Sequence, residues 1–301
     1  MPPAAVLLAL SSIALWSFLA YLGARLSHVP PFLVVGIALC IGGTVGAVRA
    51  RSWRVPRKTL LVGVGGLFGY HFLYFTAFRH APAVEANLIN YLWPLLIVLL
   101  TPVLLPGNPL RPHNLVGALL GLTGAALIIT GGRFSLETES LGGYLLMAAA
   151  ALTWACYSLL TKRLPPFPTG AVGAFCLCSG LLSLGFYALQ PHSFPLAPAL
   201  SAQEWALLLA LGLGPMGAAF YTWDAALKRG DPRIIGSLAY LIPLTSTLVL
   251  VVLGGRSLEP IAAAAMILIV AGSVVGSLDV FGPRRKPAGL PGSGKATHTG
   301  A

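Results

Sequence analysis

The sequence predicts an all-α membrane protein in which ten transmembrane helices form two five-helix repeats of inverted topology. The first observation is composition: of 301 residues, 56% are hydrophobic and only 9% are charged, and the mean hydropathy is +0.84. A soluble domain carries roughly 25% charged residues, so no soluble fold of this length could bury so much apolar surface. The second observation is a series of ten apolar runs, and the third is a pattern that recurs in both halves.

The ten apolar runs have the length that a membrane-spanning helix needs, which is ~20 residues. Turn-forming or charged segments separate them, for example His28-Val-Pro-Pro31 and Gly230-Asp-Pro232. The first run follows Met1 almost directly, without the basic segment of a signal peptide, so we expect a retained span. The expected spans cover residues 4–24, 31–48, 59–79, 84–105, 113–131, 142–161, 168–189, 204–227, 233–254 and 260–280.

The basic residues follow the expected topology. With the N-terminus in the cytoplasm, fifteen of the nineteen Lys and Arg residues fall in cytoplasmic loops and the tail, and four fall in outer loops. Cytoplasmic loops of membrane proteins collect Lys and Arg, so we expect both termini in the cytoplasm. The same distribution explains the net charge of +11 without nucleic-acid binding, which we exclude.

Several residues recur in the same order in the two halves. The pairs are Tyr91 and Tyr240, Pro94 and Pro243, Trp16 and Trp154, Arg25 and Arg163, Arg111-Pro112 and Glu259-Pro260, and Gly124 and Gly272. Because five spans is an odd number, the second copy enters the membrane upside down, which is the architecture of many secondary transporters. We expect repeats at residues 1–135 and 136–282, followed by a disordered cytoplasmic tail, 283–301, rich in Pro and Gly.

The chain is organised around Glu85-Ala-Asn-Leu-Ile-Asn-Tyr-Leu-Trp-Pro94 and its later partner, Tyr240-Leu-Ile-Pro243. A proline inside a membrane span removes a backbone donor, and matching interruptions in two halves point to a transporter's binding site. We therefore expect Pro94 and Pro243 to break their helices and to act in gating. Asn87, Asn90 and Tyr91 share a helical face with Pro94, which we expect to line the substrate pathway.

Other polar and aromatic residues near the middle of the spans extend this expected site. In the third span, Tyr70, His71, Tyr74 and Phe78 share one side. The expected substrate-binding residues are His71, Tyr74, Asn87, Asn90, Tyr91, Trp93, Trp154, Tyr157, Ser158, Ser237 and Tyr240. Each has a structural alternative: Trp16 and Trp154 could equally pack between helices, the two amides could join helices at about 0.6 kcal/mol each, and His71 could be an ordinary interior histidine.

Charged groups within the spans are scarce, and this favours a neutral or zwitterionic cargo. Glu85, Asp224 and Asp279 are expected near span ends, which leaves His71 as the one deep titratable group. Aromatic walls would hold an apolar side chain, while amides, hydroxyls and His71 would bind ammonium and carboxylate groups. The four cysteines lack metal-ligand spacing, and Gly289-Leu-Pro-Gly-Ser-Gly-Lys-Ala296 lacks the strand and helix of a phosphate-binding loop. We expect no metal and no cofactor.

Ten spans as five plus five, with a proline in the fourth and ninth, resemble the drug/metabolite transporter superfamily of the EamA type over residues 4–281. The run Asn90-Tyr-Leu-Trp-Pro94 is similar to the bacterial aromatic amino acid exporter branch. The resemblance implies efflux of phenylalanine, tyrosine and tryptophan across the bacterial inner membrane by alternating access. Superfamily members share a fold and carry different cargoes. Proton coupling through His71 is a further hypothesis.

Two other functions remain as alternatives. A transporter of the same fold for cationic drugs or other metabolites would favour a membrane-embedded acidic residue, and one for nucleotide sugars would favour a basic cluster. An intramembrane enzyme would need a nucleophile or metal motif such as GxSxG or HExxH, and the spans contain neither. The expected partners are a small-molecule substrate and the lipid bilayer. One chain already holds both halves of a site, so a monomer suffices.

Overall fold

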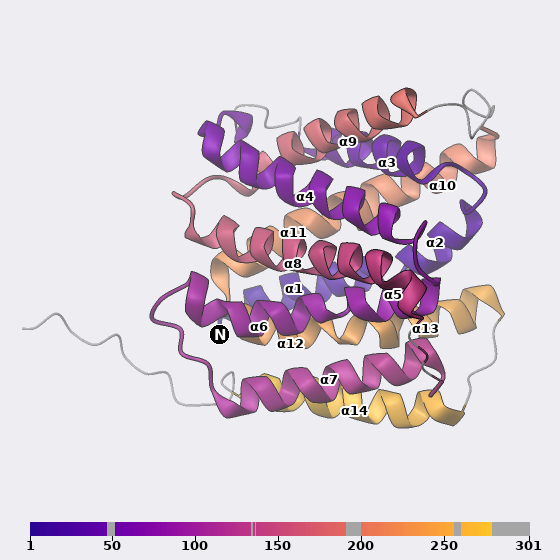
Figure 1. Cartoon of the computed structure of the whole chain (residues 1–301). Coiled ribbons are helices and arrows are strands. Elements are labelled where there is room, and N and C mark those ends of the chain that lie inside the picture. The colour runs from indigo at the N-terminus through magenta and orange to yellow at the C-terminus, as the bar shows by residue number, and fades with distance from the viewer. Residues whose placement is uncertain (47–51, 134, 136, 191–199, 256–259, 279–301) are drawn as a thin grey trace, which may run out of the picture.

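The computed structural model describes residues 1–46, 52–133, 135, 137–190, 200–255 and 260–278, and in these ranges every regular element is a helix (Figure 1). The helices of the first half are α1 Pro3–Trp16, α2 Leu19–Arg25, α3 Pro31–Val45, α4 Arg57–Ala77, α5 Ala83–Asn90, α6 Leu92–Leu104 and α7 Pro112–Thr130. Those of the second half are α8 Leu141–Arg163, α9 Val172–Leu189, α10 Ala202–Leu213, α11 Ala219–Arg229, α12 Pro232–Ala239, α13 Leu241–Gly254 and α14 Pro260–Gly276. The expected all-α class is confirmed for this part of the chain.

Eight helical stretches in the described ranges are long and apolar enough to cross a membrane. They correspond to all the expected spans except the second and the tenth. At those two places the chain forms apolar helices that are shorter, Pro31–Val45 and Ile261–Gly276. The protein is therefore a multi-pass membrane protein. The expected disordered tail, 283–301, lies outside the described residues.

Two of the long stretches are interrupted at equivalent tyrosines. Helix α5 ends at Asn90 and α6 begins at Leu92, with Tyr91 between them; α12 and α13 meet in the same way at Tyr240. Each break lies three residues before a proline of the repeated motif. A proline has no N–H to donate to the carbonyl four residues earlier, and its ring clashes with that carbonyl, so the regular helix ends just upstream.

The packing of the helices pairs elements of the first half with elements of the second (Figure 1). Helix α3 lies along α9, α7 along α14 and α6 against α12. Helix α1 lies along α11, and α4 lies along α8. The two halves are thus interleaved and bury one another's apolar faces, so neither half forms a separate compact unit.

Close approach of α7 and α14 depends on glycines at their contact. A Cβ added to Gly117 would lie 2.3 Å from the backbone nitrogen of Gly276. Gly65 on α4, in contrast, has nothing within 4 Å of such a position. We expect Gly117→Ala to lower the free energy of unfolding by about 1–3 kcal/mol, the usual cost of overpacking, whereas Gly65→Ala has no such cost. Thermal unfolding of both variants in detergent checks this, and equal melting temperatures would contradict it.

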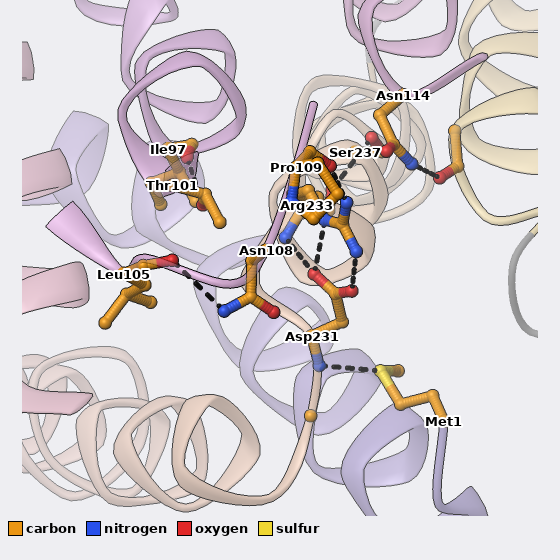
Figure 2. A network of polar contacts seen from close by, with 12 residues as sticks. Met1, Ile97, Thr101, Leu105, Asn108, Pro109, Asn114, Asp231, Arg233 and Ser237 are labelled. Carbon is orange, nitrogen blue, oxygen red and sulfur yellow. Dashed lines mark hydrogen bonds and ion pairs between the residues drawn. The ribbon is translucent and has the colours of Figure 1, made fainter. Parts of the chain in front are cut away.

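One end of the molecule, which we call the basic end, is closed by polar contacts between several segments. It comprises the N-terminus, the ends of α8 and α11, the start of α12 and the connection between α6 and α7. Figure 2 shows Asp231 and Arg233 as an ion pair, 2.5 Å between Oδ2 and Nη2, and Arg233 also donates to the carbonyl of Pro109. The N–H of Asp231 lies 3.4 Å from the sulfur of Met1, and Lys162 Nζ donates to the carbonyl of Leu227 at 2.7 Å.

Candidate functional site

A cavity of about 1310 Å³ runs from the middle of the molecule to the end opposite the basic end. Its mouth is formed by the last residues of α2, α7 and α13 and the first residues of α5, and the side chains or backbone there are exposed. Its inner part is formed by α1, α4, α6, α8 and the turn between α10 and α11. Helices of both halves therefore contribute to one cavity, and its mouth lies at the end opposite the basic end.

The inner wall of the cavity is a cluster of aromatic rings. The Trp16 and Trp154 ring centroids lie 5.8 Å apart, and Trp93 lies within 6.4 Å of both. Phe220 packs 5.6 Å from Trp154, and Trp223 lies behind the wall, 5.1 Å from Trp16. The contacts among Trp16, Trp93 and Trp154 are edge-to-face, and contacts of this kind add about 0.5–1.5 kcal/mol per pair beyond burial. The cluster forms a rigid apolar floor that separates the cavity from the basic end.

Local structure holds this floor in place. Trp16 is the last residue of α1, and its Nε1 donates to the carbonyl of Pro215 at 3.1 Å. That carbonyl belongs to a π-helical turn, Gly214–Ala218, which joins α10 to α11. Single π-turns inside helices commonly mark functional sites. Here the turn brings Pro215, Met216 and Phe220 onto the cavity wall.

Polar groups gather on one side of the cavity, on α4 and at the break between α5 and α6. Asn90 Nδ2 donates to the Tyr70 hydroxyl at 3.4 Å, while Asn90 Oδ1 is buried and has no hydrogen-bond partner in the described residues. His71 Nδ1 lies 2.7 Å from the carbonyl of Leu67. A carbonyl only accepts, so Nδ1 carries the proton and a neutral His71 offers Nε2 as an acceptor. Tyr74 and Tyr91 also line the cavity, and their hydroxyls can donate.

The cavity wall is neutral. None of the described residues that line it is Asp, Glu, Lys or Arg. The site therefore offers hydroxyl donors, amide and imidazole acceptors and aromatic faces, but no fixed charge. This combination matches a small molecule with a flat apolar group and paired, opposite charges.

This architecture matches that of a known protein family. A model of the EamA-like transporter family matches residues 3–130 and, a second time, residues 141–278. The chain belongs to the EamA-like transporter family. The two matches fit a chain built from two EamA-type segments, and the members of this family are transporters.

Several individual proteins are similar to this chain over most of its length. The chain is 43% identical over 284 residues to the aromatic amino acid exporter YddG of Ancylobacter novellus, covering 91% of this chain and 97% of that protein. It is 29% identical to a probable terminal-alkyne amino-acid exporter of Streptantibioticus cattleyicolor, covering 86% and 85%. A crystal structure with 42% identity superposes with a TM-score of 0.86 and covers 92% of this chain and 98% of that one. The protein is thus an EamA-like exporter homologue.

Most of the residues that the sequence singles out lie on the cavity wall of this EamA-like transporter. Those that line it are His71, Tyr74, Asn87, Asn90, Tyr91, Trp93 and Trp154, together with Pro243. Their contact with substrate stays a prediction. For Trp154 the two alternatives are packing between helices and contact with substrate. Its ring packs on other rings and also faces the cavity, so the structure is compatible with both.

Four expected binding residues and Pro94 do not line this cavity, and their roles in binding and gating stay predictions. Tyr157 faces Gly66, where an added Cβ would touch its ring. Ser158 accepts a hydrogen bond from Trp223 Nε1 at 3.1 Å. Ser237 is fully buried beside Gly276. Tyr240 is also fully buried, and its hydroxyl donates to the Tyr91 carbonyl at 3.3 Å.

Some residues that line the cavity are not among those predicted from the sequence. Phe220, Pro215 and Ser246 line the cavity but belong to no motif that stands out from the apolar background. For Phe220 a usable signal exists: the register that pairs Tyr91 with Tyr240, continued back without a gap, makes it the counterpart of His71. Both residues line the cavity, and their rings lie 6.3 Å apart.

Proposed function

We propose that this protein exports aromatic or other apolar amino acids across the bacterial inner membrane, by alternating access around the aromatic cavity. The observation that carries the proposal is the pairing of a neutral, tryptophan-rich floor with the unpartnered Asn90 Oδ1 on α5 and the imidazole and hydroxyl groups of α4. An indole or phenyl side chain fits against rings at the spacing that aromatic pairs prefer, 4.5–7 Å. The names of two relatives point in the same direction, since both are described as amino acid exporters.

Within the cavity the zwitterionic head group has matching partners. Asn90 Oδ1 and His71 Nε2 accept hydrogen bonds and suit the ammonium group. The hydroxyls of Tyr70, Tyr74 and Tyr91 donate and suit the carboxylate. Because Asn90 already donates to Tyr70, the Tyr70 proton is free to point toward the ligand. The side chain then rests on Trp154.

Helix pairing supports the inverted repeat behind alternating access. In terms of the ten expected spans, contacts join the first with the eighth and the third with the sixth, the second with the seventh, the fourth with the ninth, and the fifth with the tenth. Exchanging each span with its counterpart five places along leaves this set of contacts unchanged. A pseudo-two-fold axis in the membrane plane has this property, so we assign the repeats to residues 1–135 and 136–282.

The cavity opens at the end that the distribution of Lys and Arg assigns to the outside. On this assignment both termini lie in the cytoplasm and the structure is an outward-open state. A single chain supplies both halves of the cavity, and we propose that the monomer transports. The closed basic end is then the cytoplasmic gate, with Pro94 and Pro243 at the points where the gating helices bend.

A counterflow experiment tests the proposed function. Proteoliposomes are loaded with unlabelled tryptophan, given labelled tryptophan outside, and challenged with phenylalanine, alanine, lysine or a lipophilic cation. We expect labelled tryptophan to accumulate, and only aromatic amino acids to block it. Exchange of the cation without exchange of tryptophan would overturn the substrate and indicate a multidrug transporter of the same fold.

Replacing Asn90 provides a specific prediction for the head-group site. We expect Asn90→Ala to raise the half-saturation concentration for tryptophan roughly 10- to 100-fold, because a hydrogen bond to a charged group contributes about 1.5–3 kcal/mol. The matched control is Gln203→Ala, which removes an exposed amide on α10. Concentration dependence of counterflow measures both. An unchanged half-saturation concentration in Asn90→Ala would remove this residue from the site.

A further inference from the structure

An ion pair buried near the basic end has no part in the outward-facing cavity. Asp224 is 3% exposed, and its Oδ2 lies 2.6 Å from Lys228 Nζ, one helical turn further along α11. Thr169 donates to the same oxygen at 2.7 Å. The other oxygen, Oδ1, is buried without a hydrogen-bond partner in the described residues. A buried carboxylate oxygen without a partner costs free energy, so it calls for an explanation.

The repeat relates this pair to one residue of the present cavity and to one beside its mouth. The register that pairs Tyr91 with Tyr240, continued back along the chain without a gap, pairs His71 with Phe220, and these two rings lie 6.3 Å apart. His71 and Phe220 are therefore equivalent positions on α4 and α11. One turn further along, Phe75 corresponds to Asp224.

Two turns along, Arg79 corresponds to Lys228. Phe75 lines the outward-facing cavity, and Arg79 is exposed next to the lining residue Phe78. In an inverted repeat, the second state arises when the two halves exchange conformations. Asp224 then lines a cavity that opens at the basic end, and Lys228 lies beside its mouth.

What covers the pair in this structure also has a counterpart at the open cavity. The connection between α8 and α9 supplies Phe167, whose carbonyl accepts from Lys228 Nζ at 2.9 Å and whose ring lies 3.5 Å below that nitrogen. The equivalent connection, between α2 and α3, contributes Val29 and Pro31 to the mouth of the open cavity. The segment that covers Asp224 here is thus a segment that borders the pathway in the opposite state.

We propose that Asp224 and Lys228 are the inward-facing recognition site for the amino acid head group, with the carboxylate of Asp224 binding the substrate ammonium and the ammonium of Lys228 binding the substrate carboxylate. The inference rests on the proposed function. In the outward-open state the two side chains neutralise one another; at the cytoplasmic face a zwitterion inserts between them. The pathway then has two unlike halves: a neutral head-group site outside and a charged one inside.

Analogue competition at each face tests this. Membrane vesicles of known sidedness expose either the basic end or the open end to the medium, and sidedness is assigned by protease access to a C-terminal tag. Tryptophan is compared with tryptamine, which lacks the carboxylate, and indole-3-propionate, which lacks the ammonium. The measured quantity is the concentration of each compound that halves tryptophan counterflow when it is added to one face.

At the basic end of the wild-type protein we expect both analogues to inhibit at least tenfold more weakly than tryptophan. In Asp224→Asn, the half-inhibiting concentrations of tryptophan and indole-3-propionate become equal within about threefold. In Lys228→Met, the half-inhibiting concentrations of tryptophan and tryptamine become equal within the same factor. Inhibition at the open end changes by less than twofold in both variants, which also shows that they fold. The matched controls are the exposed residues Glu139→Gln and Lys58→Met, which leave discrimination unchanged.

Each result decides between the two proposals. If wild-type vesicles do not exchange tryptophan, the proposed function fails. If they do, and Asp224→Asn and Lys228→Met keep tenfold discrimination at the basic end, only the inward-facing site fails. Equal loss of activity at both faces in both variants would overturn it as well, because the pair would then maintain the fold and not select the substrate.

Discussion

Replacing Trp154 with alanine is expected to lower tryptophan counterflow at least 100-fold. The side chain is 4% exposed and packs on Trp16, Trp93 and Tyr70 while facing the cavity. Its removal opens the floor and takes away the surface on which we propose that the substrate ring rests. Losing roughly 3 kcal/mol of ring contact corresponds to about a 100-fold change.

Stability must be separated from transport in this experiment, because truncation of a buried tryptophan costs about 3–5 kcal/mol. Trp154→Phe keeps an aromatic ring at the floor, and we expect it to retain counterflow within about tenfold. Trp205→Ala is the matched control, since Trp205 lies on α10 and is 45% exposed. Melting temperatures and gel filtration are measured on all three. Normal counterflow by a well-folded Trp154→Ala protein would rule out the floor as the binding surface.

The second large effect is expected at the basic end, where Arg233→Met should destabilise the outward-open state. Arg233 is 5% exposed and joins Asp231 to the carbonyl of Pro109, which lies in the other half of the chain (Figure 2). Breaking a buried pair commonly costs 3–5 kcal/mol. Because Asp231 is partly exposed, we expect a smaller loss than this. A loss of about 1.4 kcal/mol in the stability of one state relative to the other is enough to change the ratio of their populations tenfold.

A cysteine at position 239 reports this shift. Ala239 is fully buried here and corresponds to Asn90, which lines the open cavity, so we expect it to face the cytoplasm only in the opposite state. In the Ala239→Cys background, Arg233→Met should raise the labelling rate by an impermeant maleimide from the basic end at least tenfold. Lys58→Met, an exposed charge at the same end, serves as control. A labelling rate equal to that of the control would show that this contact does not hold the gate.

The sequence predicts where the helices lie and that the fourth and ninth spans are interrupted, because hydrophobic length and proline chemistry are local. The break between α1 and α2 and the π-helical turn at Gly214–Ala218 are not among the predicted interruptions. Tyr91 and Tyr240 are found as equivalent positions from four-residue motifs, and both mark helix breaks in the structure. Their environments differ, and no local pattern tells them apart. Tyr91 faces the cavity while Tyr240 is buried, because the cavity lies at one end of the molecule and the two halves are therefore packed unequally.

Other differences have equally physical causes. Ser158 is polar and near the middle of its helix, as a binding residue would be, but its hydroxyl is occupied by Trp223. Asp224 is assigned to a span end by its place in the sequence, yet the fold buries it under the connection that contains Thr169. Partners that are far apart in sequence decide whether a polar group is available, and periodicity does not reveal them.

The neutral cavity wall has a consequence for energetics across a charged membrane. Voltage acts on net charge, at about 2.3 kcal/mol per elementary charge per 100 mV. None of the described residues that line the cavity carries a formal charge, and a zwitterion has none in sum. A zwitterion carried past this wall without an accompanying proton moves no net charge, so a cell's membrane potential neither drives nor opposes it. In that case the concentration difference of the amino acid sets the direction of flow, whereas a coupled proton would make transport depend on voltage.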